Sequence, residues 1–163
     1  MENKIAISVV LPCLNEEETI GICVEKAFAL FEKLGVSGEV IVSDNGSTDG
    51  SIKIAQEKGA RVAYAPEKGY GNAYLKGLSE SKAEYIIMAD ADNTYDILEA
   101  WKLIERLKRG SEFVIGSRFR GNILPGAMPW PNRYIGNPIL TGILNIFFNS
   151  NTSDAHSGFR AIT

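Results

Sequence analysis

Cysteine and histidine are scarce in this sequence, since 163 residues contain two cysteines and one histidine. Cys13 follows an apolar run, and Cys23 lies in a stretch with helical spacing. Both positions fit small core residues better than a disulfide framework or a cysteine-rich metal cluster. We therefore expect a reduced, intracellular protein whose chemistry depends on other side chains.

The sequence also lacks a strong excess of charge of one sign and a long apolar segment near its start. Lysine and arginine total 17 against 20 aspartates and glutamates, and the resulting net charge of -3 argues against a nucleic-acid partner. The first apolar run, Ile5 to Leu11, is too short for a signal peptide and carries no cleavage pattern. We expect one domain on the cytoplasmic side of the membrane.

Short apolar runs alternate with stretches of helical spacing along the chain. Asn15 and Glu18 have the spacing of a helix cap, and Gly35 is typical of a helix end. The predicted strands are 5–11, 39–43, 61–65, 84–89 and 113–117, and the predicted helices after the first are 51–58, 71–81 and 96–109. This alternation predicts an α/β fold: a single Rossmann-like nucleotide-binding domain with a mostly parallel central sheet and helices on both faces.

Two carboxylates, Asp90 and Asp92, follow directly after the apolar run that begins at Tyr85. Buried parallel strands of open α/β sheets present ligands at their carboxyl ends. Two neighbouring carboxylates repel each other unless a cation lies between them, and oxygen ligands suit Mg²⁺ or Mn²⁺. The pair therefore indicates a metal site for a phosphate-bearing substrate, with a solvated acidic turn or a helix cap as the alternative.

Polar loops follow the other predicted strands and are expected at the same sheet edge, where they form a cleft. Asp44 could accept hydrogen bonds from a base or a ribose, or could instead form an Asx turn. Gly69 and Gly71 lead into a helix whose free N–H groups could meet an anion or a ribose, although a tight turn is the simpler reading.

The order of these motifs is more specific than any single one. Six segments, 10–17, 42–49, 68–73, 90–95, 116–119 and 154–161, together resemble the family 2 glycosyltransferases. Within that family the chain is most similar to the polyprenol-phosphate branch, which is dolichol-phosphate mannose synthase-like. The resemblance implies a glycosyltransferase A-type fold and an inverting hexosyltransferase that moves a sugar from a UDP- or GDP-linked donor to a membrane polyprenyl or dolichyl phosphate.

The resemblance also implies roles for individual residues. The metal, Mg²⁺ or Mn²⁺, is expected on Asp90 and Asp92. The catalytic residues are expected to be Asp92, Asp154 and Arg133, the last as the arginine that receives the acceptor's phosphate. Arg118 resembles an arginine that meets phosphate. The residues expected to bind the nucleotide-sugar are Pro12, Leu14, Glu16, Asp44, Gly69, Asp90, Ala91, Asp92 and Arg118.

The predicted mechanism follows from charge. A cation on the two acids would stabilise the departing nucleoside diphosphate. A lipid phosphate acceptor is already ionised and needs no strong base, whereas a sugar hydroxyl would need a carboxylate such as Asp154. Asp154 could equally be a turn residue. For the single histidine, His156, we favour a loop contact over catalysis because nothing pairs it with a nucleophile.

The acceptor question depends on the stretch after Arg133, which has no charged residue before Asp154. Polar residues such as Asn137 and Asn145 interrupt it, so we predict an amphipathic helix at about 132–149 on the membrane surface. An ordinary core helix, or one that joins the copies of a homo-oligomer, is the alternative. Its apolar residues are Ile135, Ile139, Leu140, Ile143, Leu144, Ile146, Phe147 and Phe148.

We expect residues 1–163 to form a catalytic domain, with 1–118 as its nucleotide-sugar-binding part and 119–163 as its acceptor-side part. Because the resembling enzymes continue beyond the position of Thr163, the domain is expected to be truncated at its C-terminus. Three alternatives remain: transfer to a sugar hydroxyl in polysaccharide synthesis, a soluble nucleotidyltransferase, and a nucleotide-binding domain without activity. The nucleotidyltransferase would need a glycine-rich basic loop after the first strand, which 12–17 lacks.

Overall fold

The computed structural model describes residues 5–120 and 132–163, with the backbone alone for Arg120, Asn132 and Arg133. Six strands form one sheet in the order β3-β2-β1-β4-β6-β5. The neighbours among the first four strands are parallel, and β6 runs antiparallel to both β4 and β5. The strands are β1 (Ile7–Cys13), β2 (Gly38–Asp44), β3 (Arg61–Tyr64), β4 (Tyr85–Met88), β5 (Phe113–Ile115) and β6 (Arg160–Ile162). The predicted mostly parallel sheet is confirmed.

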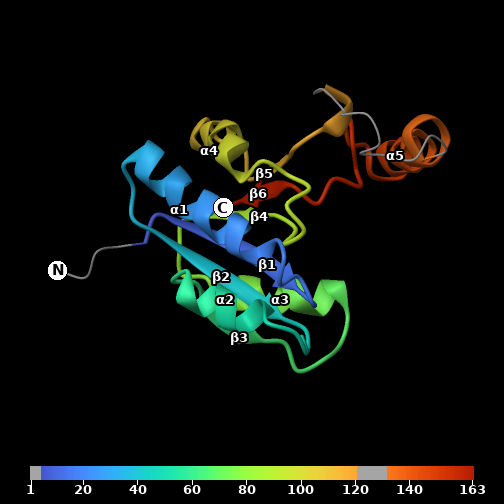
Figure 1. The fold of residues 1–163 in the computed structure, drawn as a ribbon. Helices are drawn as coiled ribbons and strands as arrows, with labels where there is room; N and C mark the ends of the chain where they lie inside the picture. Colours follow the sequence, from blue (N-terminus) through green and yellow to red (C-terminus); the bar gives the residue numbers. More distant parts are fainter. Residues whose placement is uncertain (1–4, 121–131) are drawn as a thin grey trace.

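Helices cover both faces of the sheet (Figure 1). Residues of α1, α2 and α4 share the larger apolar core on one face, whereas Tyr74 of α3 belongs to a smaller core on the other face. The helices are α1 (Ile20–Leu34), α2 (Ser51–Glu57), α3 (Tyr70–Glu80), α4 (Trp101–Lys108) and α5 (Asn137–Phe148). Shorter helical turns are η1 (Ile97–Ala100), η2 (Arg118–Arg120) and η3 (Asn132–Gly136).

The first helix ends where the sequence predicted but begins later. It ends at Gly35, which has a positive φ of 63° that glycine adopts without steric cost. The predicted cap at Asn15 is wrong, because α1 begins at Ile20 and Asn15 lies in the preceding loop with a φ of 58°. There the Asn15 side chain accepts a hydrogen bond from the Thr48 N–H at 2.8 Å. Its side chain therefore joins two loops at the sheet edge and does not start a helix.

Helix α3 packs unusually close to β1, and this closeness positions the residues at its first turn. A Cβ at Gly77 would overlap the side chain of Val10 in the middle of β1. Only glycine allows this approach, and it brings the N-terminal turn of α3 next to the end of β4. Tyr70 and Tyr74 lie on that turn and on the next.

The strand register aligns the loops that carry the predicted motifs. Cys13 at the end of β1 is paired with Asp44 at the end of β2, and Val10 is paired with Met88 at the end of β4. Because these strands are parallel, their carboxyl ends meet at one edge of the sheet. The loops that follow β1, β2 and β4 therefore face a common space, as the sequence predicted.

The helical stretch predicted at about 132–149 is present as η3 and α5, and it lies apart from the sheet (Figure 1). Most of its apolar side chains point away from the rest of the described protein, with Ile146 81% and Phe147 79% exposed. On the inner side, Asn145 donates to the Thr152 carbonyl at 2.9 Å and accepts from the Thr152 N–H at 3.0 Å. None of the helices in the described part of the chain combines the length and the apolar character that a membrane crossing needs.

Candidate active site

A pocket of about 450 Å³ opens at the edge of the sheet where β1, β2 and β4 end. Its residues come from the end of β1 and the loop after it, the residue after β2, the first turns of α3 and the loop after β4. They are Pro12, Cys13, Leu14, Glu16, Asn45, Tyr70, Ala73, Asp90, Ala91 and Asp92. Most of the residues predicted to bind a nucleotide-sugar therefore lie around one space, and Asp44, Gly69 and Arg118 are the exceptions.

The carboxylate of Asp90 is enclosed by two tyrosines and a glycine. Tyr70 donates its hydroxyl to Asp90 Oδ1 at 2.6 Å, and Tyr74 donates to the same oxygen at 3.3 Å. The other oxygen, Oδ2, lies against Gly158, where an added Cβ would overlap it. Burial and the neighbouring carboxylate raise the pKa of Tyr70 to about 12 and also raise the pKa of Tyr74. Both phenols are therefore protonated hydrogen-bond donors at neutral pH.

Asp92 lies on a loop that α1 holds from behind. Its Oδ1 accepts a hydrogen bond from the Thr94 N–H at 2.9 Å, while the residue is exposed. Behind it, Cys23 donates its thiol to the Ala91 carbonyl at 3.4 Å, and Lys26 donates to Asn93 Oδ1 at 2.9 Å. Burial raises the pKa of Cys23 to about 11, so this thiol is a neutral packing group. The loop thus presents one carboxylate to the pocket on a fixed backbone.

The two acids fit a divalent cation that shares its ligands with a substrate. Across residues 5–120 and 132–163, no group of three or more Asp, Glu, His or Cys side chains lies close enough to hold a metal ion alone. Asp90 Oδ1 already accepts two hydrogen bonds, so Asp92 is the more available ligand. Mg²⁺ is commonly bound by one or two carboxylates together with water and phosphate oxygens. This donor set suits such a cation only when a phosphate supplies further ligands.

Asp44 and Gly69 stand behind the pocket and shape its loops. Asp44 is almost fully buried, and its carboxylate accepts hydrogen bonds from the Gly46 and Ser47 N–H groups at 3.2 and 3.0 Å. This is the Asx turn that the sequence left as an alternative. The Gly69 N–H donates to Asn45 Oδ1 at 2.6 Å. This bond satisfies one of the free N–H groups at the start of α3, so that group is not available to a ligand.

Arg118 and Asp154 form a buried ion pair beside the pocket. Arg118 donates from Nε to Asp154 Oδ2 at 2.7 Å and from Nη2 to Oδ1 at 2.9 Å. The Asp154 side chain is 0% exposed. Burial alone would raise the pKa of Asp154, but the hydrogen bonds and charge of Arg118 outweigh it and lower the pKa below its ordinary value. Arg118 in turn has a raised pKa because of its hydrogen bond to Asp154.

This ion pair bears on two sequence predictions. A carboxylate with a lowered pKa and both oxygens engaged is a poor proton acceptor, so the geometry does not favour Asp154 as a general base. Arg118 has committed two N–H groups to Asp154 and does not line the pocket. His156 is exposed, and its backbone N–H donates to Asp154 Oδ1 at 3.3 Å. The side chain of Arg133 lies outside the described residues.

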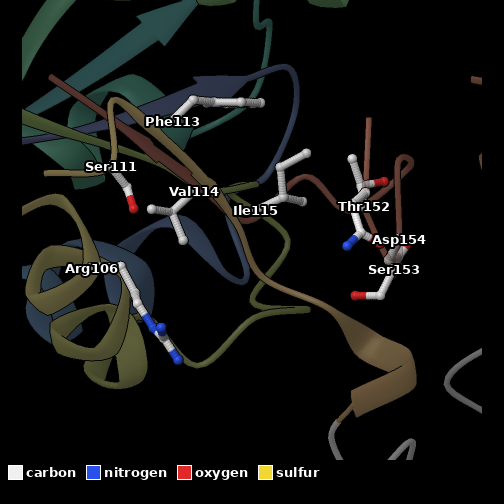
Figure 2. Close-up of a pocket in the computed structure, with 9 residues that line it drawn as sticks. Arg106, Ser111, Phe113, Val114, Ile115, Thr152, Ser153 and Asp154 are labelled. Atoms are coloured by element: carbon white, nitrogen blue, oxygen red, sulfur yellow. The ribbon is translucent and has the colours of Figure 1, made fainter. Parts of the chain in front are cut away.

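A second pocket, of about 380 Å³, lies beside β5 and has Asp154 among its lining residues (Figure 2). Figure 2 shows Val114 and Ile115 of β5 between Arg106 of α4 and the segment Thr152–Asp154. Asp154 is its only lining carboxylate, and that group is already paired with Arg118. The acid pair, Tyr70 and the end of β1 all belong to the first pocket, so we place the candidate chemistry there.

Four lining residues were not predicted as site residues, namely Cys13, Asn45, Tyr70 and Ala73, and Tyr74 was missed as a hydrogen-bond partner of Asp90. Asn45 joins loops that are distant in sequence, because its Nδ2 donates to the Glu67 carbonyl at 2.8 Å while its Oδ1 accepts from Gly69. Its place directly after Asp44 was a usable signal. Tyr70 and Tyr74 are four residues apart, but the predicted helix 71–81 began one residue after Tyr70, so their shared helical face did not follow from that prediction.

Comparisons with known proteins agree with this geometry. A family model for glycosyl transferase family 2 matches residues 8–163. The chain belongs to glycosyl transferase family 2. The low-salt glycan biosynthesis hexosyltransferase Agl6 of Haloferax volcanii is 46% identical over 158 residues, which cover 96% of this chain and 38% of that protein. The dolichol-phosphate mannosyltransferase of Pyrococcus furiosus is 31% identical over 120 residues, covering 69% of this chain and 33% of that protein.

A solved structure that resembles this chain contains a bound nucleotide-sugar. Glucosyl-3-phosphoglycerate synthase from Mycobacterium tuberculosis, in complex with Mn²⁺ and UDP-glucose, matches with a TM-score of 0.73 and 26% identity, over 97% of this chain and 56% of that one. The chain therefore has the glycosyltransferase A-type fold of family 2. It spans less than two thirds of the length of each of these three proteins.

Proposed function

We propose that this family 2 chain carries the catalytic part of an inverting hexosyltransferase, which moves a sugar from a UDP- or GDP-linked donor to a membrane polyprenyl phosphate. The observation that carries the proposal is the pocket at the ends of β1 and β4, where Asp90 and Asp92 face the loop from Pro12 to Glu16. The Mn²⁺ and UDP-glucose of the M. tuberculosis synthase support a metal-bound nucleotide-sugar as the ligand.

The donor lies across the pocket in this proposal. One wall of the pocket, on the nucleoside side, is formed by Pro12, Leu14 and Glu16. Asp44 stabilises the neighbouring loop through its Asx turn. Ala91 is nearly fully buried and has only a methyl side chain, which leaves room for the ribose and diphosphate. Gly69 holds the start of α3 through its bond to Asn45.

Asp92 holds the cation at the diphosphate of the donor in this proposal. A Mg²⁺ or Mn²⁺ ion, when bound, supplies positive charge that stabilises the departing nucleoside diphosphate. The chain contributes the exposed Asp92 carboxylate, whose loop is fixed by Cys23 and Lys26, so that little reorganisation is needed on binding. Asp90 holds its orientation through the two tyrosines and binds at the ribose side of the donor.

A phosphate acceptor needs no free base beside the pocket. A phosphate monoester is ionised near neutral pH, so its oxygen can attack the anomeric carbon without losing a proton to the protein. Attack from the face opposite the leaving diphosphate inverts that carbon. Asp154, the one base candidate, is tied to Arg118. The alternative acceptor, a sugar hydroxyl, would require Asp154 to leave this buried pair, and we therefore rank it second.

The acceptor-side part, 119–163, supports a lipid as the carrier of that phosphate. In α5 and its approach, apolar residues are exposed on a helix that the rest of the described chain does not cover. Such a helix binds at the boundary between headgroups and acyl chains, and its affinity grows with the apolar area that it buries. In this proposal the helix lies on the cytoplasmic surface of the membrane, where the lipid phosphate can reach the donor pocket. A homo-oligomer through the same helix is the competing use of this surface.

The donor proposal is tested by a calorimetric panel of UDP- and GDP-sugars with and without Mn²⁺. We expect the wild type to bind at least one donor only when Mn²⁺ is present, and Asp92→Asn to reduce that affinity by about 100-fold or more without loss of the fold. Asp96→Asn is the matched control, because Asp96 is an exposed carboxylate four residues away that caps η1. Unchanged donor affinity in Asp92→Asn would remove the metal assignment.

The acceptor proposal is tested separately with Arg133→Ala. This variant is expected to keep donor affinity while transfer to a short-chain polyprenyl phosphate falls by roughly tenfold or more, because a phosphate contact is lost. Arg109→Ala at the exposed end of α4 is the control for loss of one positive charge. Equal losses of donor binding and transfer would mean that Arg133 acts at the donor and not at the acceptor.

A further inference from the structure

The inference concerns the two tyrosines on Asp90 and rests on the proposed donor site. Both hydroxyls converge on one carboxylate oxygen, at 2.6 Å from Tyr70 and 3.3 Å from Tyr74. The opposite oxygen lies against the backbone of Gly158. The accessible oxygen of Asp90, Oδ1, therefore already accepts hydrogen bonds from the protein.

The two tyrosines differ in how firmly they are held. Tyr74 is 6% exposed and belongs to the small core between α3 and the sheet. Tyr70 is 58% exposed and lines the pocket mouth, and its ring meets that of Tyr74 edge to face at 4.9 Å. Moving Tyr74 would open a cavity in the core, whereas moving Tyr70 would expose little additional surface. Tyr70 is thus the hydroxyl that a ligand can replace.

Both hydrogen-bond donors to Asp90 Oδ1 are phenol hydroxyl groups. The positive charge of Arg160 acts to lower the pKa of Tyr70, but burial and the hydrogen bond to Asp90 outweigh it. Arg160 is fixed by a hydrogen bond from its Nε to the Ser157 carbonyl at 2.8 Å. The pKa of each tyrosine is raised, so neither becomes a phenolate at physiological pH. Asp90 is consequently a hydrogen-bond acceptor whose donors are exchangeable hydroxyl groups.

We propose that Tyr74 and Tyr70 are positioning residues of the donor site with opposite effects on binding. Tyr74 fixes the orientation of the Asp90 carboxylate in the free and the bound protein. Tyr70 occupies the position on Asp90 Oδ1 that a ribose hydroxyl of the donor takes, and it leaves when the nucleotide enters. One carboxylate oxygen has about two lone-pair sites, so a third donor requires one of the present donors to depart.

The first test measures affinity for Mn²⁺ with UDP and with GDP by calorimetry. Tyr74→Phe should weaken binding of the accepted nucleotide by about tenfold, because Asp90 loses its permanent anchor. Tyr70→Phe should leave binding unchanged or tighten it a few-fold, because no hydroxyl has to be displaced. Tyr85→Phe is the matched control, since this phenol lies beside the Glu84 carboxylate at the other end of β4.

The second test follows the displacement itself. Nucleotide binding should give a near-ultraviolet tyrosine difference spectrum in the wild type and in Tyr85→Phe, and Tyr70→Phe should lose most of it. A purely structural role for Tyr70 would not produce this signal. Thermal unfolding of each variant shows whether the fold is kept.

Three results would overturn the inference. Equal weakening by Tyr70→Phe and Tyr74→Phe would mean that both hydroxyls stay on Asp90 or touch the ligand. Unchanged binding in Tyr74→Phe, with normal binding in the wild type, would remove the tyrosine roles and leave the donor site intact. A wild type that binds neither nucleotide would instead remove the donor site itself, and the inference with it.

Discussion

The described residues of 1–118, proposed to bind the nucleotide-sugar, use their side chains in the opposite way to those of 119–163, proposed to face the acceptor. In the first, the loops after β1, β2 and β3 are tied to one another, because the side chains of Asn15 and Asn45 bond to neighbouring loops. In the second, α5 turns Ile146, Phe147 and other apolar side chains away from the described protein.

The difference shows what kind of partner each region needs. The pocket at the strand ends is lined by residues of the chain itself, and in the proposed function it needs only a nucleotide-sugar and a cation. The helix α5 contributes apolar area that no described residue covers, so its use depends on a surface outside the chain. Variants in one region should therefore leave the activity of the other region unchanged. The ion pair between Arg118 and Asp154 and the contact of Gly158 with Asp90 are exceptions, because each joins the two regions.

The largest expected effect comes from breaking that pair. Arg118→Met leaves Asp154 buried without a counter-charge, which should lower the free energy of unfolding by about 3 kcal/mol or more. The double variant Arg118→Met/Asp154→Leu should recover much of this loss, because it removes both charges together. Urea unfolding of the two variants measures the difference. If the single and double variants are equally stable, Asp154 is not charged and buried in solution.

A smaller effect is expected on the exposed face of α5. Phe147→Glu should weaken sedimentation with anionic vesicles by roughly tenfold, because a large apolar side chain is replaced by a charge that anionic lipid repels. Donor affinity should not change. Leu75→Glu on α3 is the matched control, since Leu75 is also an exposed apolar residue. Equal effects of the two variants, or none from Phe147→Glu, would contradict a membrane role for α5.

The smallest expected effect is the pH dependence of stability. The pKa of Asp154 is lowered in the folded protein, so this group binds fewer protons folded than unfolded in acid. Its stabilising contribution is complete above the ordinary aspartate pKa of about 4 and is lost as the pH falls through the lower folded value. Urea unfolding from pH 7 to pH 3 should show this decline, and Asp154→Asn should reduce it. A wild type and variant with the same acid slope would contradict the assignment.

The sequence predicted the sheet and helices well because their signals are local. Apolar runs mark β1, β2 and β4, and Gly35 ends α1 by its positive φ. Parallel topology then brings the strand ends together, so a common pocket for Pro12, Glu16 and Asp92 could be foreseen. The cap at Asn15 failed because the same side chain found a partner in a different loop, at Thr48.

The contacts that the sequence did not reveal lie between distant parts of the chain. Arg118 and Asp154 were considered as separate phosphate and base residues, whereas they are each other's partners across 36 positions. Nothing in the local sequence of either residue selects the other. The enclosure of Asp90 by Gly158 is equally non-local, because it follows from the antiparallel placement of β6 beside β4. Such pairings are decided by tertiary packing and not by periodicity.

The position of β6 between β4 and β5 has a consequence for the order of assembly during synthesis. Until residues 160–162 have been made, β5 has no neighbour in the sheet, and the turn at Gly158 cannot close behind Asp90. Contacts of such long sequence separation form slowly, and a nascent chain has to keep an open sheet edge meanwhile. The acid pair is thus translated about 70 residues before the segment that supplies its rear wall.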